Sequence, residues 1–389
     1  MLTAVVGINW GDEGKGRMVD LLSADYDIVC RYQGGNNAGH TVINDHGKIV
    51  LNLLPSGISR EGTVNVMGNG MVIDLEHLVH EIQSLREKGI HIGPDNLKIS
   101  DKAVICLPWH KMQDIMEEDR LKDKKFGSTR RGIGPVYADK YMKKAIRMGD
   151  LFAPDKLPEK VADLTEWKNL TVRGYGHEPV KAEDILAWLH EFGDPIKPYI
   201  TDVSDYLYDA ATAGENIMFE AQLGALRDIE FGIYPYTSSS CTLAGYATIG
   251  AGIPGLKLDK TIGIMKAYSS CVGEGPFTVE MFGDEAEALR RAGGEYGAAT
   301  GRPRRVGAFD IPASRYGVRM HGADCIALTK MDVLSYMDKI PVCVAYDING
   351  EITEKFPVGE RLNAAKPVFE YMEGFGDISG CRKPEDLPK

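Results

Sequence analysis

Apolar and polar positions fall into blocks along the chain, in which a short apolar run is followed by a loop and then by helical periodicity. Such runs are typical of strands that are buried on both faces, and they occur at residues 2–8, 27–33, 63–73, 216–222, 261–269 and 325–330. Helical periodicity predicts helices at 18–22, 75–88 and 109–125, and two more within 181–212. The segments 41–54 and 341–356 predict hairpins, with turns at Asp45–Gly47 and at Asn349-Gly350.

The repeated order of strand, loop and helix predicts an α/β fold with a mainly parallel central sheet flanked by helices. The length of 389 residues fits two or three domains or one large domain with insertions. Because the chain contains no internal repeat and no linker-like Pro/Ser tract, we expect a single large α/β domain over 1–389. A mainly helical insertion is expected at about residues 100–212.

Composition and charge narrow the class of protein. The residues are 43% hydrophobic and 26% charged, which indicates a globular protein. A formal charge of −11 argues against a nucleic-acid partner, so any anionic ligand needs local Lys, Arg and backbone N–H groups. Seven cysteines without a C-x-x-C pair predict reduced thiols. No apolar stretch approaches 18 residues, so we expect a cytoplasmic protein without a membrane partner.

Of the 44 glycines, 27 lie in windows at 1–50, 127–149, 214–256 and 269–310, where backbone must turn sharply or approach a ligand closely. In the first window, G-D-E-G-K-G at 11–16 follows a strand and opens a helix, as a phosphate loop does. Gly16 replaces the Ser or Thr of the usual loop. Asp12 would repel phosphates unless a metal ion or a protonatable substrate atom compensates its charge. The alternative is a simple strand-to-helix turn.

Two further motifs suggest nucleotide chemistry. GGNNAGH at 34–40 ends in His40, a candidate for catalysis, although a lone histidine is more often structural. TKMD at 329–332 is the pattern with which many GTP-binding proteins read guanine. A carboxylate there accepts two hydrogen bonds that adenine cannot donate.

Arginines and hydroxyls occupy the remaining glycine windows. GRPRR at 301–305 suits phosphate or carboxylate recognition, or forms a solvated basic surface. The segments 127–134 and 237–240 offer hydroxyl and N–H groups for a second phosphate, but an ordinary capped turn explains each equally well.

Together, seven motifs resemble adenylosuccinate synthetase in order and spacing, from residue 3 to about 380: WGDEGKG, QGGNNAGHT, STRRGIGPVYADK, FGIYPYTSSS, VGEGPF, GRPRR and ALTKMD. The resemblance implies a carbon–nitrogen ligase of AMP biosynthesis that joins L-aspartate to IMP and converts GTP to GDP and phosphate. It also implies one Mg²⁺ per subunit and a homodimer with a shared active site. The alternatives are a relative that makes the 2-amino analogue, often with ATP, and a nucleotide-binding paralogue without turnover.

The resemblance also implies roles for single residues. Asp12 resembles the base that deprotonates ring nitrogen 1 of IMP, and His40 resembles the acid at the 6-oxygen. Asp12 and Gly39 would bind the metal. The implied GTP-binding residues are Gly11, Glu13, Gly14, Lys15, Gly16, Gly39, Thr41, Arg304, Lys330 and Asp332. The implied IMP contacts are Asn37, Thr129, Lys143, Gln222, Thr237 and Arg302, and those for aspartate are Thr300 and Arg302.

Some positions depart from the pattern of the family. Gln222 lies one place early in FEAQLG, Lys143 and Cys271 stand where arginine is usual, Ala299 replaces a threonine, and Arg17 replaces a lysine. The chain also ends earlier than family members usually do. That ending implies either a shortened form or a different nucleotide selectivity.

Overall fold

The computed structural model describes residues 1–44, 47–297 and 301–388, which fall into two compact units. Unit 1 consists of Met1–Val6, Lys15–Gln222 and Ser238–Thr261. Unit 2 consists of Gly7–Gly14, Leu223–Thr237 and Ile262–Lys389. A single domain over 1–389 stays a prediction.

Unit 1 is built on a mainly parallel sheet. Its strands follow the order β1 (Leu2–Gly7), β10 (Ile217–Gly224), β2 (Ile28–Arg31), β5 (Val64–Met67), β7 (Leu97–Ser100) and β9 (Ile200–Thr201). The pairs β10–β2, β2–β5, β5–β7 and β7–β9 are parallel. Every residue of β1 and β2 is buried, as the continuous apolar runs predict.

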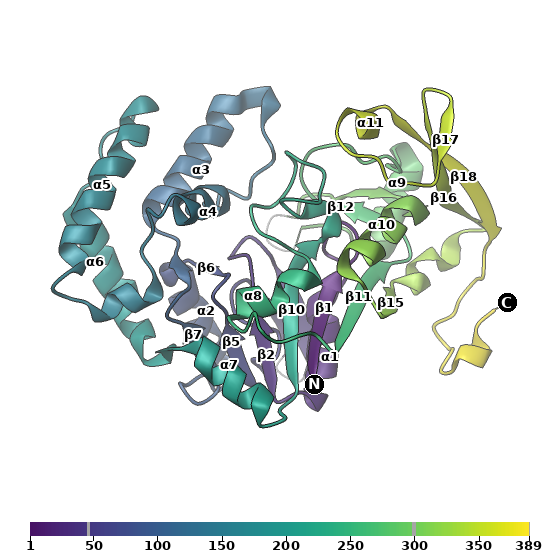
Figure 1. Ribbon diagram of the computed structural model, residues 1–389. Coiled ribbons are helices and arrows are strands. Elements are labelled where there is room, and N and C mark those ends of the chain that lie inside the picture. The colour runs from purple at the N-terminus through teal and green to yellow at the C-terminus, as the bar shows by residue number, and fades with distance from the viewer. Residues whose placement is uncertain (45–46, 298–300, 389) are drawn as a thin grey trace. The chain divides into compact units, whose positions relative to one another are not determined.

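Helices flank this sheet and fill the segment between Pro108 and Thr212 (Figure 1). They are α1 (Lys15–Leu22), α2 (Leu75–Glu87), α3 (Pro108–Leu121), α4 (Ile133–Tyr141), α5 (Leu157–Gly174), α6 (Ala182–Gly193), α7 (Val203–Thr212) and α8 (Ala247–Ala251). Helix α5 packs against α6, and α3 packs against α4. The expected helices are therefore confirmed, whereas the status of the segment as an insertion stays a prediction.

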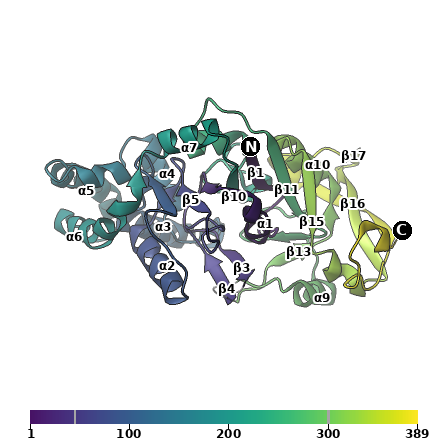
Figure 2. The same cartoon turned by 90° about the horizontal axis from the view of Figure 1, so that it is seen from below.

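Two short strand pairs complete unit 1. Strands β3 (His40–Asn44) and β4 (Gly47–Leu51) form the predicted antiparallel hairpin (Figure 2), although its turn residues 45 and 46 lie outside the described residues. Strands β6 (Val72–Ile73) and β8 (Val104–Ile105) pair in parallel. The strand expected within 63–73 and ending at glycines is β5, which stops at Met67 before the turn at Gly70, whereas Val72–Ile73 form the separate strand β6. A Cβ at Gly70 would lie 2.1 Å from the carbonyl oxygen of Tyr32.

Unit 2 contains the parallel pair β11 (Lys260–Lys266) and β15 (Cys325–Thr329), together with a second sheet. The second sheet consists of β14 (Phe309–Asp310), β16 (Lys339–Ile348), β17 (Glu351–Thr353) and β18 (Ala365–Glu373). Strands β12 (Ser269–Cys271) and β13 (Arg305–Gly307) form an antiparallel pair. The helices are α9 (Gly283–Gly293), α10 (Ile311–His321) and α11 (Glu360–Asn363). In Figure 1, β16 and β18 run side by side as a long ribbon.

The buried strand expected at 261–269 is confirmed as β11, and two further predictions for unit 2 had opposite outcomes. The hairpin at 341–356 is confirmed, with Asn349 and Gly350 both at positive φ between β16 and β17. The expectation that 325–330 is a buried strand is wrong, because β15 is an edge strand whose one neighbour among the described strands is β11. It exposes Ile326 by 41% and Leu328 by 44%. No helix among the described residues is long and apolar enough to cross a membrane.

Candidate active site

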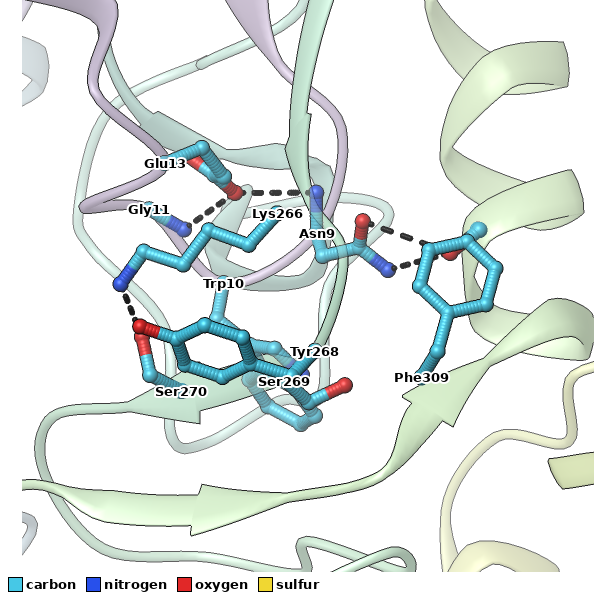
Figure 3. Close-up of a pocket in the computed structure, with 10 residues that line it drawn as sticks. Asn9, Trp10, Gly11, Glu13, Lys266, Tyr268, Ser269, Ser270 and Phe309 are labelled. Carbon is cyan, nitrogen blue, oxygen red and sulfur yellow. Dashed lines mark hydrogen bonds between the residues drawn. The ribbon is translucent and has the colours of Figure 1, made fainter. Parts of the chain in front are cut away.

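The glycine-rich loop between β1 and α1 has the strained backbone that close approach to a ligand requires. Gly11, Asp12 and Gly14 have φ values of 97°, 58° and 98°, all in the left-handed region. The Glu13 carboxylate folds inward and accepts hydrogen bonds from the N–H groups of Asn9 (3.1 Å) and Gly11 (2.8 Å), as Figure 3 shows. Glu13 thus braces the loop from within, whereas the Asp12 side chain is 37% exposed.

Gly16 stands where the usual phosphate loop carries a hydroxyl, and its surroundings explain the difference. A Cβ at this position would lie 2.7 Å from the Cβ of His40 and 3.2 Å from the Oγ of Ser56. Contacts below about 3 Å between such atoms are not tolerated in a packed interior. Gly16 therefore allows the start of α1 to pack directly against His40.

His40 is held by a buried carboxylate from β10. Its Nδ1 lies 2.5 Å from the Oε1 of Glu220, which is completely buried. Glu220 also accepts hydrogen bonds from the Ser56 N–H (2.8 Å) and hydroxyl (2.5 Å). Burial by itself raises the pKa of Glu220, but His40, Arg31 and Ser56 outweigh it and hold that pKa below its usual value. The ionised carboxylate accepts a hydrogen bond from the Nδ1–H of His40, so the Nε2 of the ring points away from Glu220.

Two of the predicted IMP contacts meet in unit 1. Gln222 donates from Nε2 to the Oδ1 of Asn37 at 2.5 Å, and its Oε1 accepts from the Nη2 of buried Arg31 at 2.7 Å. The early position of Gln222 is accommodated by Leu223, whose φ of +64° is unusual for a residue with a branched side chain.

The other predicted IMP contacts in unit 1 lie on its surface. Thr129 is exposed in the loop before α4, and Asp114 anchors both sides of that loop. The Asp114 carboxylate accepts from the Ser128 hydroxyl (2.6 Å) and from the Gly132 N–H (2.8 Å). Lys143 is exposed just after α4, at a φ of +62°.

The predicted guanine-reading segment lies beside the phosphate loop. Thr329 ends β15 and donates its hydroxyl hydrogen bond to the carbonyl oxygen of Glu13 at 2.8 Å. Lys330, at a φ of +63°, donates from Nζ to the carbonyl oxygen of Gly293 at 3.1 Å, and Asp332 is exposed. The structure therefore brings the two nucleotide motifs of unit 2 together.

A network of charges surrounds Asp12 in unit 2. Arg304 donates from Nη1 to the Oε2 of Glu295 (2.8 Å), and its Nη2 lies 3.4 Å from the Oδ2 of Asp12. The other Glu295 oxygen accepts from Lys266 (2.6 Å) and from the Tyr268 hydroxyl (2.5 Å). Burial lowers the pKa of Lys266 and raises that of Tyr268.

A small polar pocket adjoins this network, and Figure 3 shows its lining. The residues that line it are Asn9, Trp10, Gly11, Glu13, Lys266, Tyr268, Ser269, Ser270, Phe309 and Ser314.

The remaining predicted site residues are dispersed within their units. Gly39 and Arg302 are exposed, and Thr41 and Thr237 are half-buried. Thr300 and Ala299 lie outside the described residues.

Cys271, which occupies a position where the family usually has arginine, is buried and accepts a hydrogen bond at Sγ from Arg227 Nη2 at 2.8 Å. Burial raises the pKa of its thiol. All seven cysteines are free, as expected.

Sequence reasoning missed the charged residues that hold the candidate catalytic groups. Arg31 and Lys266 are the last residues of β2 and β11, and Glu220 lies in the middle of β10. A charge inside an apolar run is costly unless it is paired, and ligands of α/β sheets bind beyond the carboxyl ends of strands. A charged residue late in an apolar run was therefore a readable signal.

These features define a class of protein before any comparison is made. A strained glycine loop followed by a helix, with a guanine-type motif beside it, defines a nucleotide-dependent α/β enzyme. The family model for adenylosuccinate synthetase matches residues 4–389. The chain belongs to the adenylosuccinate synthetase family, whose members are ligases.

Individual relatives agree with this assignment. An adenylosuccinate synthetase from Caldanaerobacter subterraneus subsp. tengcongensis is 45% identical over 390 residues, covering 100% of this chain and 91% of the relative. The structure of a fully ligated adenylosuccinate synthetase from Plasmodium falciparum matches with a TM-score of 0.90 at 36% identity, covering 99% of this chain and 91% of that one. The predicted fold class is thus confirmed.

A third comparison concerns the fold alone. A cyanophage S-2L succinoaminodeoxyadenylate synthetase, bound to dGMP and dATP, matches at a TM-score of 0.58 and 20% identity, over 84% of this chain and 83% of that one.

Proposed function

We propose that this protein catalyses the GTP-dependent ligation of L-aspartate to IMP, giving adenylosuccinate, GDP and phosphate. The observation that carries the proposal is the division of labour between two adjacent acids of the phosphate loop. Glu13 is buried and bonded to the loop backbone, which leaves Asp12 as the carboxylate that a ligand can reach. A nucleotide-binding loop without chemistry of its own would have no use for a strained, accessible carboxylate next to phosphates.

In the first step, Asp12 accepts the proton from ring nitrogen 1 of IMP. The negative charge that develops on the 6-oxygen allows this oxygen to attack the γ-phosphate of GTP, and GDP leaves. Lys15 and the loop N–H groups at Gly11, Gly14 and Gly16 hold the phosphates of GTP.

In the second step, the amine of L-aspartate attacks carbon 6 of the phosphorylated intermediate, and inorganic phosphate leaves. His40, in its imidazolium form, donates a hydrogen bond from Nε2 to the 6-oxygen while its Nδ1–H stays bonded to the ionised Glu220. Phosphorylation makes the 6-oxygen a good leaving group, which an amide-like oxygen is not.

Substrate selection is assigned to the remaining residues. Lys330 and Asp332 read guanine, and Thr41 and Arg304 contribute to GTP binding. Thr300 and Arg302 bind aspartate. The IMP contacts are Asn37, Thr129, Lys143, Gln222, Thr237 and Arg302. The bond between Asn37 and Gln222 supports a shared role for this pair.

The metal is assigned as one Mg²⁺ per subunit, held by the Asp12 carboxylate and the Gly39 carbonyl oxygen. Both are hard oxygen donors, which Mg²⁺ prefers. Among the described residues no group of three or more His, Cys, Asp or Glu side chains could hold a metal, and Mg²⁺ commonly takes most of its ligands from water and phosphate. When bound, Mg²⁺ would neutralise charge on the phosphates.

A homodimer with a shared active site is part of the proposal. Lys143 would reach the IMP phosphate of the other subunit, and it lies on an exposed surface beside Tyr141 and Met142, which are 74% and 58% exposed. Exposed apolar side chains around a cation are typical of an interface core and its anchor. We assign the enzyme to the cytoplasm, where free cysteines stay reduced.

The deciding experiment incubates the protein with GTP, IMP, L-aspartate and Mg²⁺ and follows the succinyl adduct by its absorbance and GDP by chromatography. We expect product only when all substrates are present. ATP in place of GTP, or dGMP in place of IMP, should give little product. Product from dGMP and ATP would instead support the 2-amino activity, and nucleotide binding without product would support a paralogue without turnover.

A further inference from the structure

We propose that Glu295 is a positioning residue that orients Arg304 beside Asp12. The functional consequence rests on the proposed function, in which Arg304 binds GTP and Asp12 is the base. Glu295 follows α9, and among the described residues its side chain bonds Lys266, Tyr268 and Arg304 and neither Asp12 nor any group assigned to IMP or aspartate.

Glu295 is almost completely buried, with 1% of its side chain exposed. A carboxylate at such a position is tolerated only when its oxygens are fully bonded, and here both oxygens are used. Oε1 accepts from Lys266 at 2.6 Å and from the Tyr268 hydroxyl at 2.5 Å, and Oε2 accepts from Arg304 Nη1 at 2.8 Å.

The rigid guanidinium of Arg304 takes its orientation from its bond to Glu295. Because the group is planar, fixing Nη1 on Glu295 also fixes the direction of Nη2 and Nε. Nη2 lies 3.4 Å from Asp12, a long contact for an ion pair, and the buried Nε has no hydrogen-bond partner among the described residues. Glu295 thus holds one edge of Arg304 tightly and leaves a donor edge for an anion such as a phosphate oxygen.

Lys266 offers a way to separate this role from a structural one. Its Nζ is buried between Glu295 and the Ser270 hydroxyl (2.6 Å), so removing the charge of Glu295 leaves an unpaired buried ammonium. If the unpaired ammonium lowers the stability of Glu295→Gln, replacing Lys266 in the same protein restores that stability. Loss of orientation at Arg304 cannot be relieved in this way.

The test compares Glu295→Gln, the double variant Glu295→Gln/Lys266→Met, and Glu287→Gln as a matched control. Glu287 lies on α9 and bonds Arg290 and Arg291 at the surface. For each protein the melting temperature is measured, together with kcat and the KM values for GTP and IMP. Crystal structures without ligand report the position of Arg304.

We expect Glu295→Gln to lower kcat/KM for GTP about 100-fold, as misplacement of a contact by about 1 Å can do. KM for IMP should change less than about twofold, because no IMP group is touched. The double variant should regain the melting temperature but not kcat/KM for GTP. The control should match the wild type, and only the Glu295 variants should show Arg304 displaced from Asp12.

Recovery of GTP kinetics in the double variant, or unchanged GTP kinetics in Glu295→Gln, would overturn the proposal while leaving the proposed function intact. If the wild type forms no product from GTP, IMP and L-aspartate, the proposed function is wrong instead. The crystal structures then decide the positioning role, because an unmoved Arg304 in Glu295→Gln contradicts it.

Discussion

His40 in unit 1 and Asp12 in unit 2 are both tied to a buried glutamate, but in different ways. His40 contacts Glu220 directly, with 2.5 Å between Nδ1 and Oε1. Asp12 is connected to Glu295 only through Arg304, and its own contact with that arginine measures 3.4 Å. The first group has a short contact with a buried carboxylate, whereas the second has a long contact with a side chain whose Nε has no hydrogen-bond partner among the described residues.

The difference indicates how each group is prepared for reaction. A buried charge-assisted hydrogen bond fixes the position of the ring, so the orientation of His40 is set before any substrate arrives. A partly exposed ion pair contributes little free energy and can be exchanged for another partner. The contact between Asp12 and Arg304 can therefore be exchanged, with a cation pairing with Asp12 and phosphates pairing with Arg304.

The largest effect is expected from Asp12→Asn, which tests the exchangeable side of the comparison. An amide keeps the size of the side chain but cannot accept a proton, so kcat should fall more than about 1,000-fold. The measurement is phosphate release with all substrates at saturation. Appreciable residual turnover would show that Asp12 is not the base.

Glu220→Gln tests the anchored side. Loss of the carboxylate should leave the His40 ring without its anchor and its imidazolium form without a counter-charge, and should lower kcat about 100-fold, with KM for GTP nearly unchanged. Glu81→Gln is a control for loss of a buried acid, since Glu81 accepts from the backbone N–H groups of Asn52 and Leu53 and burial raises its pKa. Equal kinetic losses in both variants would mean that burial of charge matters and the contact with His40 does not.

Asp310 sharpens the comparison among buried acids, because within the described part of the chain it pairs with no cation. Burial raises its pKa from 3.8 to about 6, although Tyr346 donates to both oxygens at 2.7 Å. A raised pKa in the folded state means that stability is greatest below the unfolded value and is lost as pH rises through about 6. Relative to Asp310→Asn, the wild type should lose about 2 kcal/mol of unfolding free energy between about pH 4 and about pH 8. Denaturant titrations of both proteins across this range measure the difference, and a constant difference would contradict the assignment.

Asp332→Asn should have the smallest effect. The amide can no longer accept two hydrogen bonds from guanine but can donate to xanthine, so preference for GTP over xanthosine triphosphate should fall about tenfold or more. Competition kinetics with the two nucleotides provide the readout. An unchanged ratio would remove Asp332 from guanine recognition and leave the comparison between His40 and Asp12 untouched.

Local patterns were enough to predict much of the fold. Continuous apolar runs indicated β1, β2 and β10, and the Asn349-Gly350 dipeptide indicated the hairpin of β16 and β17, because both signals depend on neighbouring residues alone. The same signal was wrong for β15, since hydrophobicity does not tell whether a strand has a partner on each side. Strand β18 was not predicted, because its nine residues, all of them exposed or half-buried, are defined by pairing with β16.

The sequence by itself predicted which residues carry the chemistry, because Asp12, Lys15, His40 and the TKMD segment are recognisable from residue type, spacing and position after strands. Only the tertiary structure decided what holds them. Glu220 lies 180 residues along the chain from His40, which it holds. Glu295 lies 9 residues from Arg304. Gly16 acquires its meaning only from the nearby Cβ of His40. Local sequence encodes backbone preference and residue chemistry, whereas pairing of buried charges depends on which distant segments the packed core brings into contact.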